Sequence, residues 1–108
     1  IFIADLNPVQ VSEQIGKRPV IVVSDEDFNK HMPVTTVLPI TSLKVGRKVY
    51  PNEVMVKRGI GGLGQDSIIL AHQIRTISKQ RLKDLMGVID DHKIKEAISE
   101  ALRVHLNL

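Results

Sequence analysis

The sequence contains no cysteine and no tryptophan, and its only aromatic side chains are Phe2, Phe28 and Tyr50. Without cysteine, a disulfide framework, a thiolate metal site and a cysteine nucleophile are all excluded. The apolar runs have the length of strands, too short for a membrane-spanning helix, and no basic start followed by an apolar core indicates a signal peptide. We therefore expect a cytoplasmic protein that does not contact a membrane.

The length and charge indicate one small domain. The 108 residues are enough for a single core, so we expect residues 1–108 to form one domain. Lys and Arg total 15 against 12 Asp and Glu, which gives a formal charge of +3. This mildly basic balance is compatible with a polyanionic partner. The chain opens inside an apolar strand without a Met, so we expect a few further residues before Ile1.

Short strands followed by one amphipathic helix make up the predicted fold. The strands are expected at residues 1–6, 19–24, 34–41, 52–57, 67–71, 73–77 and 86–89, with short helices at 25–32 and 78–82. Residues 91–106 have the spacing of a helix with one buried face, capped by Asp90 or Asp91; its apolar residues are Ile94, Ala97, Ile98, Ala101, Leu102 and Leu106. This order predicts an α+β fold, an antiparallel β-barrel with a helix packed on it.

Two other patterns carry no site. The segment 59–64 matches G-x-G-x-x-G, but it precedes a strand instead of opening a helix, so we interpret it as a turn and not as a dinucleotide site. His31, His92 and His105 lie far apart without metal-ligand spacing, and no metal or cofactor is expected.

Six sequence blocks together resemble the MazF/PemK family of bacterial toxins. The blocks occur in the family's order, and the resemblance runs from Ile1 to Leu108. The blocks are Asp-Leu-Asn-Pro at 5–8, Ser-Glu-Gln at 12–14, Lys-Arg-Pro at 17–19, Pro-Ile-Thr-Ser at 39–42, Asp-Ser-Ile-Ile-Leu at 66–70 and Gln-Ile-Arg-Thr-Ile at 73–77. The resemblance implies a small SH3-like, CcdB-like barrel.

The resemblance also implies an activity and partners. The activity is that of an mRNA interferase, a sequence-specific and metal-independent endoribonuclease that cuts single-stranded RNA by attack of the ribose 2'-hydroxyl on the adjacent phosphate. The products carry a 2',3'-cyclic phosphate and a free 5'-hydroxyl. The partners implied are single-stranded RNA, a second copy of the chain in a homodimer, and a cognate MazE-like antitoxin that holds the enzyme inactive.

Three residues are the candidates for catalysis. Arg18 lies at a loop–strand junction, and its guanidinium has a fork of donors that fits phosphate oxygens. Thr41 lies at a strand end and can donate its hydroxyl to the same phosphate. Since arginine does not deprotonate under ordinary conditions, another group must handle the protons, and Glu13 is the candidate.

The candidate RNA contacts are polar or cationic, because so few aromatic residues are available for stacking. Either Tyr50 or Phe28 could stack a base, although Phe28 is equally suited to core packing. The side chains that we expect to contact RNA are Ser12, Gln14, Lys17, Ser42, Lys44, Lys48, Tyr50, His72 and Gln73.

His72 is the most individual of these residues. Relatives usually place a carboxylate before the block that begins at Gln73, whereas this chain has an imidazole. The imidazole could assist proton transfer, or it could contact a base and so alter the RNA word that is cut. We prefer the second interpretation, because a position filled by different chemical types among relatives is a poor place for an essential catalyst.

Two other functions remain open. A gyrase poison on the same fold would rely on a C-terminal Trp, and this chain ends in Leu106, Asn107 and Leu108. A non-catalytic RNA-binding barrel would not need Arg18 and Thr41 together, and both are present.

Overall fold

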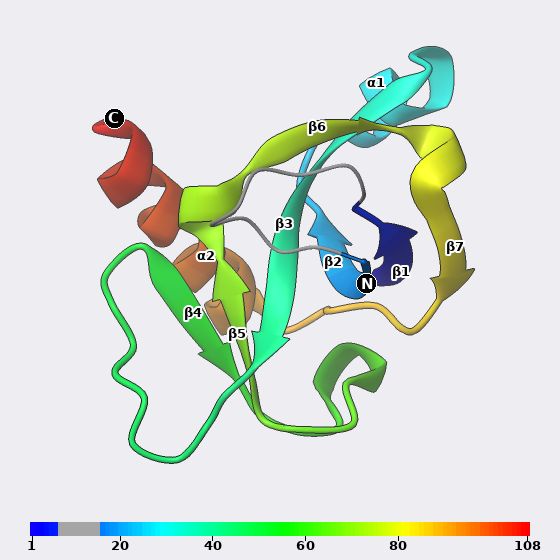
Figure 1. The fold of residues 1–108 in the computed structure, drawn as a ribbon. Helices are drawn as coiled ribbons and strands as arrows, with labels where there is room; N and C mark the ends of the chain where they lie inside the picture. Colours follow the sequence, from blue (N-terminus) through cyan, green and yellow to red (C-terminus); the bar gives the residue numbers. More distant parts are fainter. Residues whose placement is uncertain (7–15) are drawn as a thin grey trace.

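A computed structural model describes residues 1–6 and 16–108 (Figure 1). The strands are β1 (Phe2–Asp5), β2 (Lys17–Val22), β3 (Val34–Ser42), β4 (Glu53–Val56), β5 (Ser67–Leu70), β6 (Arg75–Ser78) and β7 (Leu82–Leu85). The α-helices are α1 (Glu26–His31) and α2 (His92–Leu106), and three 3-10 turns are η1 (Ile60–Gly62), η2 (Ala71–Gln73) and η3 (Lys79–Arg81).

The long strand β3 organises the sheet. One of its edges pairs antiparallel with β2, from Val22 opposite Val37 to Val20 opposite Pro39. Its other edge pairs first with β6 and then with β5, which are joined through η2. The strand β4 extends the sheet beyond β5, and β1 joins β2 to β7. The ladder between β3 and β2 ends at Pro39, and the last three residues of β3 pair with β5.

The five strands β6, β3, β2, β1 and β7 follow one another by hydrogen bonding, and η3 leads directly from β6 to β7. Figure 1 shows this sheet curling round so that β6 passes over the top toward β7. The arrangement confirms the predicted α+β fold with an antiparallel, SH3-like barrel. Within the described residues, no helix combines the length and the apolar character needed to cross a membrane.

The helix α2 covers one part of the core. Asp91 is its N-cap and accepts a hydrogen bond from the backbone N of Lys93, as predicted. Ile98 and Ala101 are buried, and Ile94, Ala97 and Leu102 pack against the same cluster. Leu106 is 46% exposed, so its expected place on the buried face was wrong. The apolar stripe ends one turn before the helix does.

The strand predicted at residues 86–89 was also wrong, since the strand in this region is β7 (Leu82–Leu85). Residues 86 and 87 turn inward, where the backbone N of Met86 donates to the carbonyl of Ile1 at 2.8 Å. Gly87 lies against Gly61 and Gly62 so closely that a Cβ on Gly87 would be 2.5 Å from the carbonyl carbon of Gly61. This glycine-on-glycine contact, which the sequence pattern does not reveal, ends the strand early.

Candidate functional site

Arg18 and Thr41 lie on the adjacent strands β2 and β3. The ladder between these strands has its last pair at Val20 and Pro39. Arg18 and Thr41 each lie two residues beyond this last pair, and Thr41 pairs with Ile68 of β5. Arg18 is exposed and Thr41 is half-buried. Lys17 precedes Arg18 on β2, and Ser42 follows Thr41 on β3.

The described residues on either side of segment 7–15 lie close to Arg18. Leu6, which follows β1, donates its backbone N to the carbonyl of Gly16 at 2.9 Å. The guanidinium of Arg75 donates to the carbonyl of Leu6 at 3.3 Å, which ties the same point to β6. The candidates Ser12, Glu13 and Gln14 lie outside the described residues. Gly16 is two residues from Arg18 along the chain.

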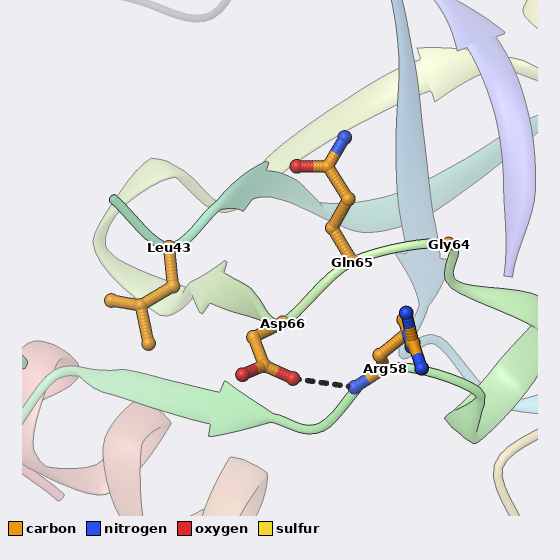
Figure 2. A pocket seen from close by; sticks show the side chains of 5 residues that line it. All are labelled: Leu43, Arg58, Gly64, Gln65 and Asp66. Atoms are coloured by element: carbon orange, nitrogen blue, oxygen red, sulfur yellow. Dashed lines mark hydrogen bonds between the residues drawn. The ribbon is translucent and has the colours of Figure 1, made fainter. Parts of the chain in front are cut away.

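A hollow of about 470 Å³ lies just beyond the end of β3 (Figure 2). It is lined by Leu43, Arg58, Gly64, Gln65 and Asp66. Figure 2 shows the Asp66 carboxylate reaching the backbone N of Arg58, a hydrogen bond of 2.8 Å. The backbone N of Leu43 donates to the carbonyl of Asp66 at 2.8 Å, which holds the two walls together. Arg58 and Gln65 thus supply donor groups to the lining of a hollow that begins at Leu43, the residue after Ser42.

A second polar cluster surrounds the carboxylate of Glu53, the first residue of β4. Its side chain is only 2% exposed. Arg47 binds it with both guanidinium nitrogens, Nη1 to Oε1 at 3.0 Å and Nη2 to Oε2 at 2.8 Å. The backbone N of Tyr50 donates to Oε1 at 3.0 Å, and the Nε2 atom of His72 lies 3.0 Å from Oε2. Four contacts therefore fill the acceptor sites of this buried carboxylate.

These contacts determine the charge of Glu53. The hydrogen bonds from Arg47 lower its pKa to about 2, helped by the Tyr50 amide and by His72, although burial acts in the opposite direction. The pKa of Arg47 is raised in turn by its hydrogen bond to Glu53. The pair is therefore ionised at neutral pH, and Glu53 is not available as a general base.

The ionised carboxylate assigns the protons of His72. A carboxylate only accepts hydrogen bonds, so Nε2 of His72 must carry the proton that it shares with Glu53. In the neutral ring, Nδ1 is then an acceptor. The His72 side chain is 31% exposed, and its ring lies 6.4 Å from that of His105 on α2, in an edge-to-face arrangement. The neighbouring Gln73 is half-buried in η2.

Segment 43–52 carries the other predicted RNA contacts. Lys44 and Lys48 are exposed, and Tyr50 is 51% exposed. The Nζ atom of Lys48 lies 5.3 Å from the centroid of the Tyr50 ring. Phe28 is 69% exposed on α1, so it is not a core residue. The structure thus groups Lys48, Tyr50 and His72 around the Glu53 cluster, while Arg18 lies on β2 and Thr41 near the end of β3.

The sequence analysis missed Glu53. Its partners lie three, six and nineteen residues away, on a loop and a 3-10 turn, so no local spacing marks the cluster. A Glu at the start of an otherwise apolar strand was the one available signal. Among the described residues, no group of three or more His, Cys, Asp or Glu is placed to hold a metal ion.

Comparisons with known proteins agree with this fold. Residues 1–106 match the family model described as PemK-like, MazF-like toxin of type II toxin-antitoxin system. A Staphylococcus saprophyticus protein named Endoribonuclease MazF is 38% identical over 108 residues, which are 100% of this chain and 88% of that protein.

Solved structures of similar proteins share the architecture. A MazF toxin of Mycobacterium tuberculosis superposes with a TM-score of 0.81 at 28% identity, covering 100% of this chain and 96% of its own. A mycobacterial endoribonuclease in complex with its cognate antitoxin superposes with a TM-score of 0.79 at 22% identity, covering 99% and 90%. The match over nearly the whole length, in sequence and in fold, means that this chain belongs to the PemK-like, MazF-like toxin family of type II toxin–antitoxin systems.

Proposed function

We propose that this chain is an endoribonuclease toxin that cuts single-stranded mRNA at specific sequences without a metal ion. The observation that carries the proposal is the family match over residues 1–106, and the positions of Arg18 and Thr41 on the adjacent strands β2 and β3 support it. Because mRNA is a cytoplasmic substrate, the proposal places the toxin in the cytoplasm, where cleavage would arrest growth.

In the proposed reaction, the ribose 2'-oxygen forms a bond to the adjacent phosphorus while the bond from phosphorus to the 5'-oxygen breaks. Arg18 binds the phosphate oxygens through its guanidinium fork, and Thr41 donates its hydroxyl to the same group. Both contacts strengthen as negative charge grows in the transition state. Glu13 accepts the proton from the 2'-hydroxyl, and the 5'-oxygen leaves as a hydroxyl after protonation.

The RNA strand would run from this centre over the exposed cations. Lys17 precedes Arg18 on β2, and Ser42 follows Thr41 on β3. Lys44 and Lys48 lie on segment 43–52. Their charges neutralise phosphates, so binding should weaken as salt concentration rises. Ser12, Gln14, Tyr50, His72 and Gln73 would supply base contacts.

A cognate MazE-like antitoxin is the proposed inhibitor, as for the mycobacterial endoribonuclease whose structure contains its antitoxin. An acidic, partly disordered antitoxin tail lying over the basic segments would compete with RNA. A complex of toxin and antitoxin that still cleaves RNA at the full rate would contradict this mode of inhibition.

We also propose a homodimer, because a chain of 108 residues has a small core and gains buried area by pairing. Light scattering at micromolar concentration should give twice the mass of the 12.0 kDa chain. A monomer under these conditions would contradict the proposal.

The test of the activity is incubation of the purified protein with a long RNA in EDTA, followed by mapping of the cut sites and of the end chemistry. We expect cuts at a recurring short sequence in single-stranded regions, with a 2',3'-cyclic phosphate and a 5'-hydroxyl at each cut. Activity that disappears in EDTA and returns with a divalent ion would contradict the metal-independent mechanism. RNA that is bound but never cut would instead indicate a non-catalytic RNA-binding barrel.

A further inference from the structure

The burial of an ionised carboxylate at Glu53 requires a physical explanation. An ionised carboxylate removed from water is costly unless charged and hydrogen-bonding partners surround it. Glu53 has such partners in Arg47, His72 and the Tyr50 amide, and its side chain is 2% exposed. For stability alone, apolar residues in place of both Glu53 and Arg47 would serve as well as such a buried ion pair. The cluster is better explained by the positions in which it holds segment 43–52 and His72.

The cluster joins segment 43–52 to the turn η2. Segment 43–52 connects β3 to β4, and the carboxylate at its end binds residues in its middle, at Arg47 and Tyr50. Arg47 also donates to the carbonyl of Lys48 at 2.5 Å. On the other side, the same carboxylate holds His72, which lies in η2 after β5. One side chain thus determines how the segment lies relative to the imidazole.

Tyr50 and His72 line a common hollow of about 600 Å³, whose lining also includes Arg47 and Glu53. Lys48 lies over the Tyr50 ring, so a cation for a phosphate and an aromatic face for a base are next to each other. The Nδ1 atom of His72 adds a hydrogen-bonding group. Arg47, which is engaged by Glu53, holds the segment and leaves the RNA contacts to Lys48 and Tyr50.

We propose that Glu53 is a positioning residue for RNA recognition, which holds segment 43–52 and the His72 ring so that Lys48, Tyr50 and His72 receive one nucleotide of the substrate. This inference rests on the proposed endoribonuclease function. Glu53 itself does not touch the RNA. It acts by keeping the binding arrangement populated before the substrate arrives.

The Glu53→Gln variant tests the proposal, because it keeps the shape of the side chain and removes the charge that Arg47 binds. If the arrangement that binds RNA falls to about a tenth of the population, the apparent affinity falls about tenfold. We therefore expect KM for a short RNA to rise about tenfold, with kcat at saturating RNA close to the wild-type value, since bound RNA restores the arrangement. The distribution of cut sites should broaden, a change that a loss of stability alone would not produce.

A matched control is Glu26→Gln on α1, which removes one negative charge from an 87% exposed side chain that pairs with Lys30 at 4.0 Å. Its KM, kcat and cut sites should equal those of the wild type. Circular dichroism confirms that each variant is folded under the assay conditions.

The second variant, Arg47→Gln, removes the other side of the ion pair from a side chain that is 32% exposed. It keeps the inference testable if Glu53→Gln does not fold, because it too should raise KM and leave kcat. The double variant should be no worse than either single variant, since both remove the same clamp. Additive losses in KM would contradict the clamp.

The outcomes separate the inference from the function on which it rests. A wild-type protein that does not cut RNA in EDTA contradicts the proposed function. A wild-type protein that cuts, with folded Glu53→Gln or Arg47→Gln variants that keep the wild-type KM and cut sites, overturns the positioning role of Glu53. A fall in kcat at unchanged KM also overturns it, because the residue would then act on the chemical step.

Discussion

Arg18 lies near the start of β2 with its side chain exposed, and Thr41 lies on the adjacent strand β3. The Arg18→Ala variant should lose about 100-fold or more of the cleavage rate, because one donor to the transition-state charge contributes about that much. The measurement is a single-turnover rate on a short RNA at saturating enzyme. Lys17→Ala is the comparison, and it should mainly weaken binding. A rate for Arg18→Ala close to wild type would place the phosphate site elsewhere.

His72 donates its Nε2 proton to Glu53, and its side chain lines the hollow beside Tyr50. The His72→Gln variant replaces the two imidazole nitrogens with an amide, which also offers a donor and an acceptor but at a different spacing. We expect it to change which RNA sites are cut, with little loss of maximal rate and an unchanged pH–rate profile. A variant that keeps its cut sites but loses most of its rate, together with a pH inflection near the ordinary imidazole pKa of about 6.5, would make His72 the general base.

At this scale, sequence reasoning could identify a side chain near a strand end, such as Thr41, whereas Lys17 lies outside the strand predicted at 19–24 and is the first residue of β2. It could not identify Glu53, whose role depends on contacts with a loop and a 3-10 turn that only the folded sheet brings together. His72 stood out in the sequence because relatives usually have a carboxylate before Gln73. Only the structure identifies Glu53 as its partner.

At the scale of elements, η1 and the segment after β7 depend on glycine. Gly62 has φ of 82°, and a Cβ on it would be 2.2 Å from the carbonyl oxygen of Met86. The Gly62→Ala variant should therefore lose about 2–4 kcal/mol of unfolding free energy, from left-handed backbone strain and from overpacking. Gly64→Ala is the control, since it has nothing within 4 Å of its Cβ position. Urea denaturation of both variants measures the difference, and equal stabilities would contradict the close packing.

The same contact shows why the elements were only partly predictable. Hydrophobic alternation and the three-four spacing predicted most strands and α2, because those elements follow from local pattern. The predicted strand at 86–89 failed, since the contact of Gly87 with Gly61 and Gly62 is a tertiary one. The segment 59–64 was correctly interpreted as a turn, and η1 lies within it.

At the scale of the molecule, the candidate residues lie on different elements of one sheet. Arg18 lies on β2, and Thr41 lies near the end of β3, where it pairs with Ile68 of β5, the strand that leads to His72 in η2. The proposed chemistry and the proposed recognition of a base are thus held on one continuous sheet but by different elements. Variants of Arg18 and Thr41 should change the rate, and variants of the Glu53 cluster should change affinity and the choice of cut site.

The Glu53 cluster also makes the stability of the whole molecule depend on acid. The pKa of Glu53 is lowered from 4.5 to about 2, chiefly by the hydrogen bonds from Arg47. A carboxylate with a lowered pKa in the folded state stabilises the protein above its unfolded pKa, and this contribution is lost as the pH falls toward the folded pKa. The loss should therefore occur between about pH 5 and pH 2, and the full shift corresponds to about 3 kcal/mol.

The measurement is the unfolding free energy of wild type and Glu53→Gln by urea denaturation across this range, at one fixed protein concentration. The wild type should be the more stable at neutral pH, and its advantage should shrink steadily as the pH falls from about 5 to 2. The contact with His72 persists in acid, because a protonated imidazole still donates through Nε2. Glu26→Gln, at an exposed carboxylate, should show almost no such change. If the difference between wild type and Glu53→Gln stayed constant with pH, the Glu53 carboxylate would not carry the charge on which the cluster depends.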